Sequence, residues 1–290
     1  MTNVKWVVDS HLHLFKKASK EYPRDCGSFY DANREALVEN FLEVMDANNV
    51  QHAVIVPLGT EVRYLKEILR TYPEKFAGVA VLDYGSSDQC RDIHQWKNEI
   101  GIKGVRVMGR LGNPSANRFR DLDLAILLRE MEALNLILWF YGSLDQLNLL
   151  HLVAEELPNL KIVLNHLGFC QQGFLVDDFR RPHIEVELPP PSVGRVEALA
   201  QFQNVYVMFS GEYGFSHENY PYSDVAPIAQ RVLEAFGSKR LLWASDWPWI
   251  EVNPSYSSLI ALTDVYFDSI SIQDWQDIMG GNAKKLFGFR

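Results

Sequence analysis

Short apolar runs recur along the whole chain and alternate with longer stretches in which apolar residues have helical spacing. The runs are apolar at nearly every position rather than at every second one, which is typical of buried parallel strands. The pattern predicts eight strands, at residues 6–15, 53–59, 76–83, 104–109, 136–142, 161–168, 205–211 and 241–249.

Amphipathic helical patterns fall between these runs. Helices are expected at 34–49, 121–134, 143–157 and 224–236, and between Thr60 and Pro73. Strands in strict alternation with helices predict an α/β fold, a closed (β/α)8 TIM barrel. A doubly wound open sheet, the main alternative, usually has a glycine-rich turn after its first strand. Here the sequence HLHLFKK takes that place.

The length of 290 residues suits one such barrel, which needs about 250, and no linker or repeat divides the chain. We therefore expect a single domain, 1–290. A net charge of −9 with dispersed basic residues argues against a nucleic-acid partner. No run is long enough for a membrane span, and the three cysteines lack metal-type spacing, so a cytoplasmic protein is expected. The sequence gives no indication of an oligomeric state.

Histidines and one aspartate mark the ends of three predicted strands. On a strand, residues two apart share a side, so Asp9, His11 and His13 are expected to face the barrel interior together. His166 and Asp246 close two later strands, and each is expected to share a face with the apolar residues two and four positions before it, Ile162 and Leu164 for His166 and Leu242 and Ala244 for Asp246. Barrel enzymes work at the carboxyl ends of their strands. His11, His13, His166 and Asp246 therefore predict an active site.

The chain resembles the amidohydrolase-related branch of the amidohydrolase superfamily. The matching segments follow the family's order and are VVDSHLHLF, GVRVMG, IVLNHLG, VYVMFSG, WASDWPW and IMGGNAKKLFGF. Within the branch, SDWPW, GVR and the Tyr22-Pro23 pair are most similar to the 2-pyrone-4,6-dicarboxylate, sulfomuconolactone and sugar-lactone hydrolases. The resemblance implies that the three histidines and Asp246 open a lactone of a small, carboxylated or sugar-derived substrate.

Three histidines and an aspartate could hold one divalent ion, with zinc the first candidate. The binuclear sites of the superfamily use a bridging lysine on a middle strand, and neither GVRVMG nor LILWFYG ends in one. Several of the similar lactonases work without metal, so a mononuclear and a metal-free site both stay open. In either case Asp246 would act as general base on water, and the histidines or their metal would stabilise the oxyanion.

Several further residues are candidates for substrate binding. Arg106 and Arg110 could pair with a substrate carboxylate. The others are Tyr141, Ser210, His217 and Trp247, with Trp249 as a second wall of the pocket. Each could instead serve structure alone, as a surface ion pair, a rim aromatic or a packed tryptophan.

Two other functions stay open at this stage. A metal-dependent non-oxidative decarboxylase of the same superfamily would need a bound ion and His217. A catalytically inactive barrel that serves as a binding protein would be expected to have lost one of the four central residues. The long irregular stretch 169–191 is either a lid over the site or a surface excursion.

Overall fold

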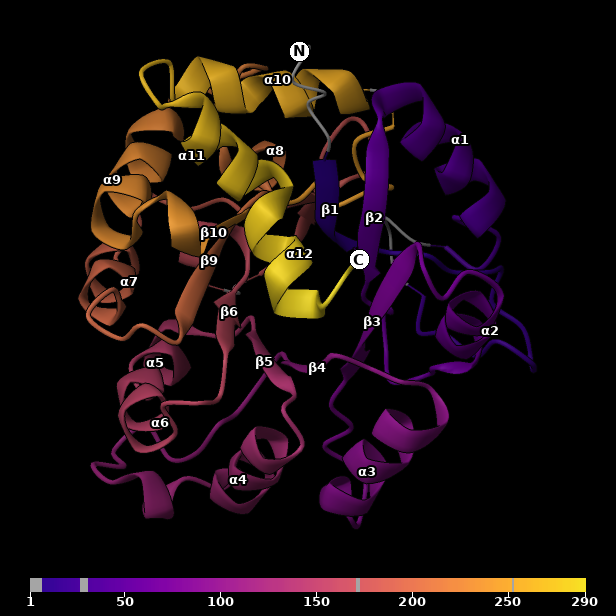
Figure 1. Cartoon of the computed structure of the whole chain (residues 1–290), viewed down its shortest axis with the longest axis vertical. Helices are drawn as coiled ribbons and strands as arrows, with labels where there is room; N and C mark the ends of the chain where they lie inside the picture. Colours follow the sequence, from indigo (N-terminus) through magenta and orange to yellow (C-terminus); the bar gives the residue numbers. More distant parts are fainter. Residues whose placement is uncertain (1–6, 27–30, 171–172, 252) are drawn as a thin grey trace.

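Eight parallel strands form one sheet in the computed structural model, which describes residues 7–26, 31–170, 173–251 and 253–290. Their order is β1-β2-β3-β4-β5-β6-β9-β10, and helices surround them (Figure 1). The strands are β1 Val7–Leu12, β2 Val50–Ile55, β3 Phe76–Val81, β4 Gly104–Val107, β5 Ile137–Phe140, β6 Ile162–Leu164, β9 Val205–Phe209 and β10 Leu241–Trp243. The predicted (β/α)8 barrel is confirmed, although the expected start of the first strand at residue 6 lies outside the described residues.

The helices are shorter than predicted and more numerous. Residues 143–157 form two short helices instead of one, and the helix expected from residue 34 begins at Val38 because Ala36 pairs with Phe15 in an isolated bridge. The helices are α1 Val38–Asn48, α2 Arg63–Thr71, α3 Gln89–Glu99, α4 Ala125–Ala133, α5 Leu144–Leu147, α6 Leu150–Glu156, α7 Val193–Leu199, α8 Glu212–Phe215, α9 Ala226–Phe236, α10 Tyr256–Tyr266, α11 Ile272–Gln276 and α12 Asn282–Phe287. None of the described helices is long and apolar enough to cross a bilayer.

The barrel has an inner and an outer layer of apolar side chains. Val8, Val79 and Trp139 belong to the inner layer, together with Ala283 and Phe287 of α12. This helix lies across one end of the barrel in Figure 1, and its Phe287 ring contacts Trp139, with ring centroids 5.9 Å apart. The opposite end, where the strands finish, is therefore the end that is free to hold a site.

The barrel closes at a seam between β1 and β10. The two strands share few backbone hydrogen bonds: Asp246 N donates to His11 O over 3.0 Å, and His13 N donates to Trp247 O over 2.8 Å. The Asp9 carboxylate supplies further hydrogen bonds across the seam. Its Oδ1 accepts from Ser245 N (2.9 Å), and its Oδ2 accepts from the Ser245 hydroxyl (2.5 Å) and from Tyr256 of α10 (2.7 Å).

The prediction that Asp9 shares a face with His11 and His13 was wrong. The pairing of β1 with β2 is irregular between Asp9 and Leu12. Val8 packs in the inner layer and Leu12 in the outer one, although simple alternation would place both on one side. Such a bulge re-aims side chains, so that Asp9 turns outward to the seam while the histidines turn inward.

We expect Asp9→Ala to lower the free energy of unfolding by at least about 3 kcal/mol, because several buried donors would lose their acceptor. Asp9→Asn should cost about 1–2 kcal/mol, since its amide can still pair with hydroxyls that are free to rotate. Denaturant unfolding followed by circular dichroism measures both. Equal losses in the two variants would contradict the role of this carboxylate in the seam.

Candidate active site

His11 and His13 lie at the carboxyl end of β1 and point into the barrel mouth. The His11 ring is fully buried and stacks on Trp139, with centroids 5.7 Å apart. His13 Nδ1 donates to the carbonyl of Val56 over 2.8 Å. This bond fixes the His13 ring and directs its Nε2 toward the centre of the site.

His166 reaches the site by leaving the extended conformation. β6 ends at Leu164, and His166 adopts a left-handed backbone with φ of 47°. The expectation that His166 shares a face with Ile162 and Leu164 was wrong, because both of these pack in the outer layer. Left-handed conformations are costly for residues other than glycine and are common at functional sites.

Ser210 and Gly211 hold the His166 ring from the side. Ser210 Oγ lies 3.0 Å from His166 Nδ1, within hydrogen-bond distance. Gly211 approaches so closely that a Cβ there would lie 2.6 Å from His166 Nδ1. Its φ of 81° also favours glycine, so this position admits no side chain without moving the histidine.

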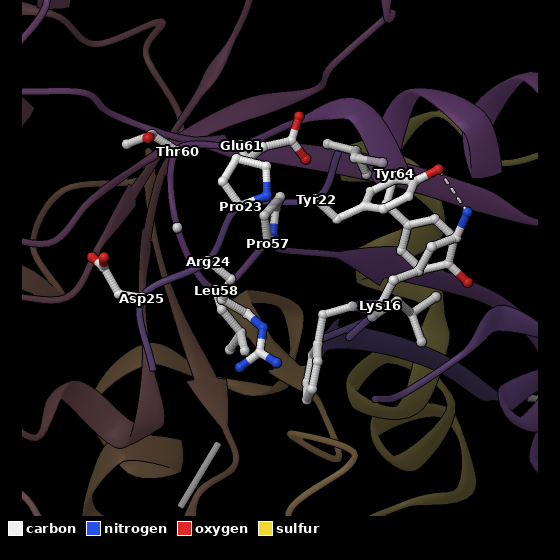
Figure 2. A pocket seen from close by; sticks show the side chains of 14 residues that line it. Lys16, Tyr22, Pro23, Arg24, Asp25, Pro57, Leu58, Thr60, Glu61 and Tyr64 are labelled. Carbon is white, nitrogen blue, oxygen red and sulfur yellow. Dashed lines mark hydrogen bonds between the residues drawn. The ribbon is translucent and has the colours of Figure 1, made fainter. Parts of the chain in front are cut away.

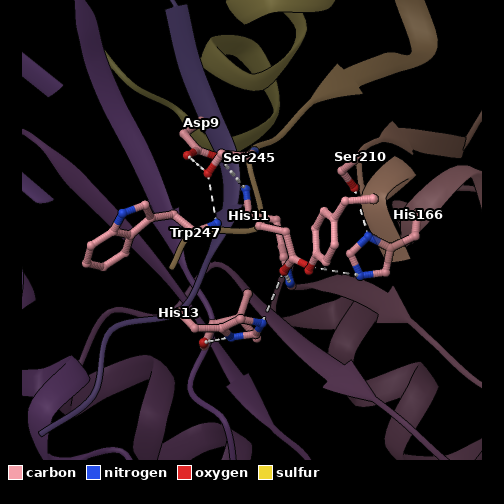
Figure 3. A network of polar contacts seen from close by, with 10 residues as sticks. Asp9, His11, His13, His166, Ser210, Ser245 and Trp247 are labelled. Carbon is pink, nitrogen blue, oxygen red and sulfur yellow. Dashed lines mark hydrogen bonds and ion pairs between the residues drawn. The ribbon is translucent and has the colours of Figure 1, made fainter. Parts of the chain in front are cut away.

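Asp246 lies among three imidazoles, those of His11, His13 and His166. The three histidines are labelled in Figure 3, where dashed lines mark the polar contacts of the site. Asp246 Oδ1 lies 3.3 Å from Nε2 of both His11 and His13, and its Oδ2 lies 3.9 Å from Nε2 of His166. Like His166, it follows the end of its strand with a left-handed φ of 58°. The four residues predicted as the centre of the site are therefore brought together.

Burial decides which groups of this cluster are charged at neutral pH. Burial lowers the pKa of His166 to about 4 and that of His11 well below its usual range. Burial opposes ionisation of Asp246, but the surrounding histidines outweigh it and hold its pKa well below the usual value. At neutral pH the site thus holds one carboxylate among imidazoles, of which at least His11 and His166 are neutral.

The donor set fits a divalent metal ion. Nitrogen or oxygen atoms of His11, His13 and Asp246 all lie within 4.8 Å of one another. His13 Nδ1 must carry a proton to donate to a carbonyl, so a neutral His13 would turn the lone pair of Nε2 toward the carboxylate. A cation between these atoms removes that repulsion, and His11 Nε2 and Asp246 Oδ1 have no hydrogen-bond partner among the described residues.

A cavity of about 230 Å³ opens directly above the cluster. Arg106 and Tyr141 line it, and the Arg106 guanidinium lies 5.4 Å from the centre of the Tyr141 ring. Arg106 is 5% exposed and forms no ion pair among the described residues. Phe174 and Ile184 show that the stretch 169–191 supplies part of the wall. Closure of that stretch over the cavity stays a prediction.

Of the other predicted substrate residues, Trp249 lines this cavity, and Arg110, Ser210, His217 and Trp247 do not. Arg110 is exposed and pairs with Asp123 over 2.7 Å. Trp247 packs against Phe41 in the outer layer, with centroids 5.2 Å apart, whereas Trp249 does line the cavity. Ser210 contacts His166 instead, as described above. His217 lies exposed in a loop, where its backbone N–H donates to Asp224.

The sequence analysis missed Tyr213 and Glu212, which form the first turn of α8. Tyr213 lines the cavity and donates to Asp246 Oδ2 over 2.6 Å. Glu212 is buried, and burial, reinforced by the charge of Asp246, raises its pKa to about 8. Glu212 is therefore neutral at pH 7 and leaves Asp246 as the ionised carboxylate here. Their position just after the end of β9, where barrel enzymes place site residues, could have indicated these two residues from the sequence.

A second cavity of about 340 Å³ lies at the same end of the barrel, between the loops after β1 and β2 (Figure 2). Leu58 lines both cavities. Lys16 bridges Tyr22 and Glu67, with both distances 2.8 Å, and its ammonium lies over the Tyr22 ring. Glu67 thus neutralises the charge of Lys16 in the wall of this cavity.

A family model described as Amidohydrolase matches residues 8–289. The chain belongs to the amidohydrolase family. The resemblance noted from its motifs is thereby confirmed, and the match spans nearly all of the barrel.

Two characterised relatives and one solved structure are similar to this amidohydrolase. It is 25% identical to an L-fucono-1,5-lactonase of Burkholderia ambifaria, over 83% of this chain and 80% of the relative. It is 42% identical to a 4-sulfomuconolactone hydrolase of Rhizobium radiobacter, over 48% of this chain and 46% of the relative. An amidohydrolase from Burkholderia multivorans with bound zinc has the same fold, with a TM-score of 0.75, 18% identity, and coverage of 98% of this chain and 100% of that one.

Proposed function

We propose that this amidohydrolase is a lactonase, which opens a small cyclic ester by attack of water. The observation that carries the proposal is the ionised Asp246 held among His11, His13 and His166 at the floor of a cavity. The names of the two relatives, a sugar lactonase and a sulfomuconolactone hydrolase, support the same reaction.

Asp246 is the general base. Its Oδ1 belongs to the cluster with His11 and His13, so Oδ2 is the atom that takes a proton from water. The resulting hydroxide attacks the ester carbonyl carbon and forms a tetrahedral oxyanion. When the ring C–O bond breaks, Asp246 returns the proton to the departing oxygen.

His166 is placed to stabilise the oxyanion. If the Ser210 hydroxyl donates to Nδ1, the neutral ring carries its proton on Nε2 and donates it into the cavity. The lowered pKa of His166 keeps the ring neutral at pH 7, so it acts as a hydrogen-bond donor and not as a second acid.

His11, His13 and Asp246 would hold a divalent ion, with zinc the best match to two imidazoles and a carboxylate. When bound, such an ion would polarise the carbonyl and make water more acidic. His166 lies beside this group and would complete the site from the other side of Asp246.

The cavity favours a small substrate that carries a carboxylate. Its volume is below the range of about 300–1,000 Å³ that is usual for drug-sized ligands. Arg106 offers a buried guanidinium with no anionic partner among the described residues. A buried cation of this kind is stabilised when a carboxylate binds it through two hydrogen bonds.

The decarboxylase alternative is weaker. It depended on His217, which lies exposed in a loop and does not line the cavity above Asp246. The inactive-barrel alternative expected a lost central residue, and the four central residues instead converge on one point.

Asp246→Asn should keep the fold and lower kcat on a lactone by at least about 100-fold, because the amide cannot take a proton from water. Lactone hydrolysis followed by acid release measures the loss. Asp277→Asn is the control, since Asp277 is buried at a distance from the cavity. Near-normal activity of Asp246→Asn would exclude this mechanism.

Protein purified without added metal should contain about one equivalent of zinc per chain. Chelation should remove both the zinc and most of the activity, and added zinc should restore them. His13→Ala should bind no zinc, whereas His52→Ala, near the amino end of β2 where the His52 ring stacks on Phe289, should keep it. Elemental analysis decides the point; full activity without metal would leave Asp246 as a free general base.

Arg106→Met should raise KM for a carboxylated lactone by about 10- to 100-fold, since a bidentate charged contact is lost. KM for an uncharged lactone of equal size should change little. Arg110→Met, which removes only an exposed ion pair with Asp123, serves as the control. Equal effects of Arg106→Met on both substrates would argue against carboxylate recognition.

A further inference from the structure

Tyr213 is tied to the catalytic carboxylate from outside the histidine cluster. It is 3% exposed, and its hydroxyl donates to Asp246 Oδ2 over 2.6 Å. Burial, reinforced by the charge of Asp246, raises the pKa of Tyr213 well above 10, so the hydroxyl keeps its proton and donates it. This bond uses one lone pair of Oδ2, the oxygen of Asp246 that does not face His11 and His13, and leaves the other for the proton from water.

Tyr213 is held in turn by Arg181, which comes from the long stretch 169–191. The Arg181 guanidinium lies 4.9 Å from the centre of the Tyr213 ring. Arg181 lies in the turn between two short antiparallel strands, β7 Leu175–Val176 and β8 Pro182–His183. It is only 5% exposed, and its Nε donates to Asp177 Oδ2 over 2.6 Å. A further hydrogen bond runs to the carbonyl of Asn253, beyond β10. Arg181 is thus fixed on both sides.

We propose that Tyr213 is a positioning residue that orients the Asp246 carboxylate, and that Arg181, in the turn between β7 and β8, acts through Tyr213 by holding its ring in place. The proposal rests on the proposed function, in which Asp246 is the base. It assigns the stretch 169–191 a part in the site beyond its contribution to the cavity wall.

The physical need for such a contact lies in the freedom of a carboxylate to rotate about its Cβ–Cγ bond. Oδ1 lies 3.3 Å from two imidazoles without a hydrogen bond among the described residues, and without Tyr213 the nearest partner of Oδ2 there would be His166, at 3.9 Å. That distance is too long for a hydrogen bond. A misplacement of about 1 Å at a reacting group can cost about 100-fold in rate.

The link to the long stretch follows from the packing of the Tyr213 ring. A guanidinium over an aromatic face is attractive, and more so when both groups are buried. Removing it leaves the phenol free to tilt, and a tilt moves the hydroxyl away from Oδ2. Arg181 forms no hydrogen bond or ion pair with Asp246 among the described residues, so its effect is expected to pass through the Tyr213 hydroxyl.

The first test compares crystal structures of the whole protein with those of Tyr213→Phe and Arg181→Met. We expect the Asp246 carboxylate to rotate in Tyr213→Phe, so that Oδ1 no longer lies near both His11 and His13. In Arg181→Met, the Tyr213 hydroxyl should move away from Oδ2. An unchanged carboxylate in both variants would overturn the proposal, whatever the protein hydrolyses.

The second test is kinetic, with a lactone that the wild-type protein hydrolyses. Tyr213→Phe should lower kcat by about 10- to 100-fold while KM stays within about twofold, because only the alignment of the base changes. Arg181→Met should lower kcat by about 10-fold. The double variant should match Tyr213→Phe, since Arg181 has nothing to act on once the hydroxyl is gone.

Matched controls are Tyr266→Phe and Arg240→Met. Tyr266 is a buried tyrosine whose hydroxyl donates to a backbone carbonyl, and Arg240 packs over Phe236 and donates to the carbonyl of Phe202. Both should leave kcat unchanged. Additive losses in the double variant, or a rise in KM at constant kcat, would overturn the proposal. If the wild type hydrolyses no lactone, the proposed function fails and the crystal structures alone decide the role of Tyr213.

Discussion

The hydrogen bonds of Asp9 are the constraint on which the rest of this barrel depends. The first and last strands meet with few backbone hydrogen bonds, and the Asp9 carboxylate joins them by binding the backbone and hydroxyl of Ser245 and the hydroxyl of Tyr256. His11 and Asp246 are the immediate neighbours of these anchors in the chain. The distance between the Asp246 carboxylate and the His11 imidazole is therefore set by the same contacts that close the barrel.

The chemistry of the site arises from burial as much as from residue identity. Burial holds His166 and His11 neutral and Glu212 protonated, so a single carboxylate remains ionised beside three rings. Exposed to water, these groups would have pKa values close to the usual ones for their residue types. In the barrel mouth their charges are separated, and Arg106, which forms no ion pair among the described residues, adds a buried guanidinium to the cavity wall.

The sequence predicts the barrel and the four central residues well, because buried parallel strands and polar residues at their ends are local signals. It fails where the backbone departs from regular geometry. A bulge in β1 changes the alternation and turns Asp9 to the other face. His166 has a left-handed backbone, which the spacing of residues in the sequence cannot predict. Helix α3 was missed because Ile93 is its only buried residue. Tyr213 needed the tertiary structure, since it lies in α8 and its partner Asp246 follows β10.

The position of the site on the seam also has a consequence for how the protein is made. His11 and His13 of β1 leave the ribosome before Asp246 and the helix α12 that plugs the barrel. Until β10 emerges, the nascent barrel has an open edge and the site lacks Asp246. The four central residues can therefore meet only after the last strand of the barrel is in place.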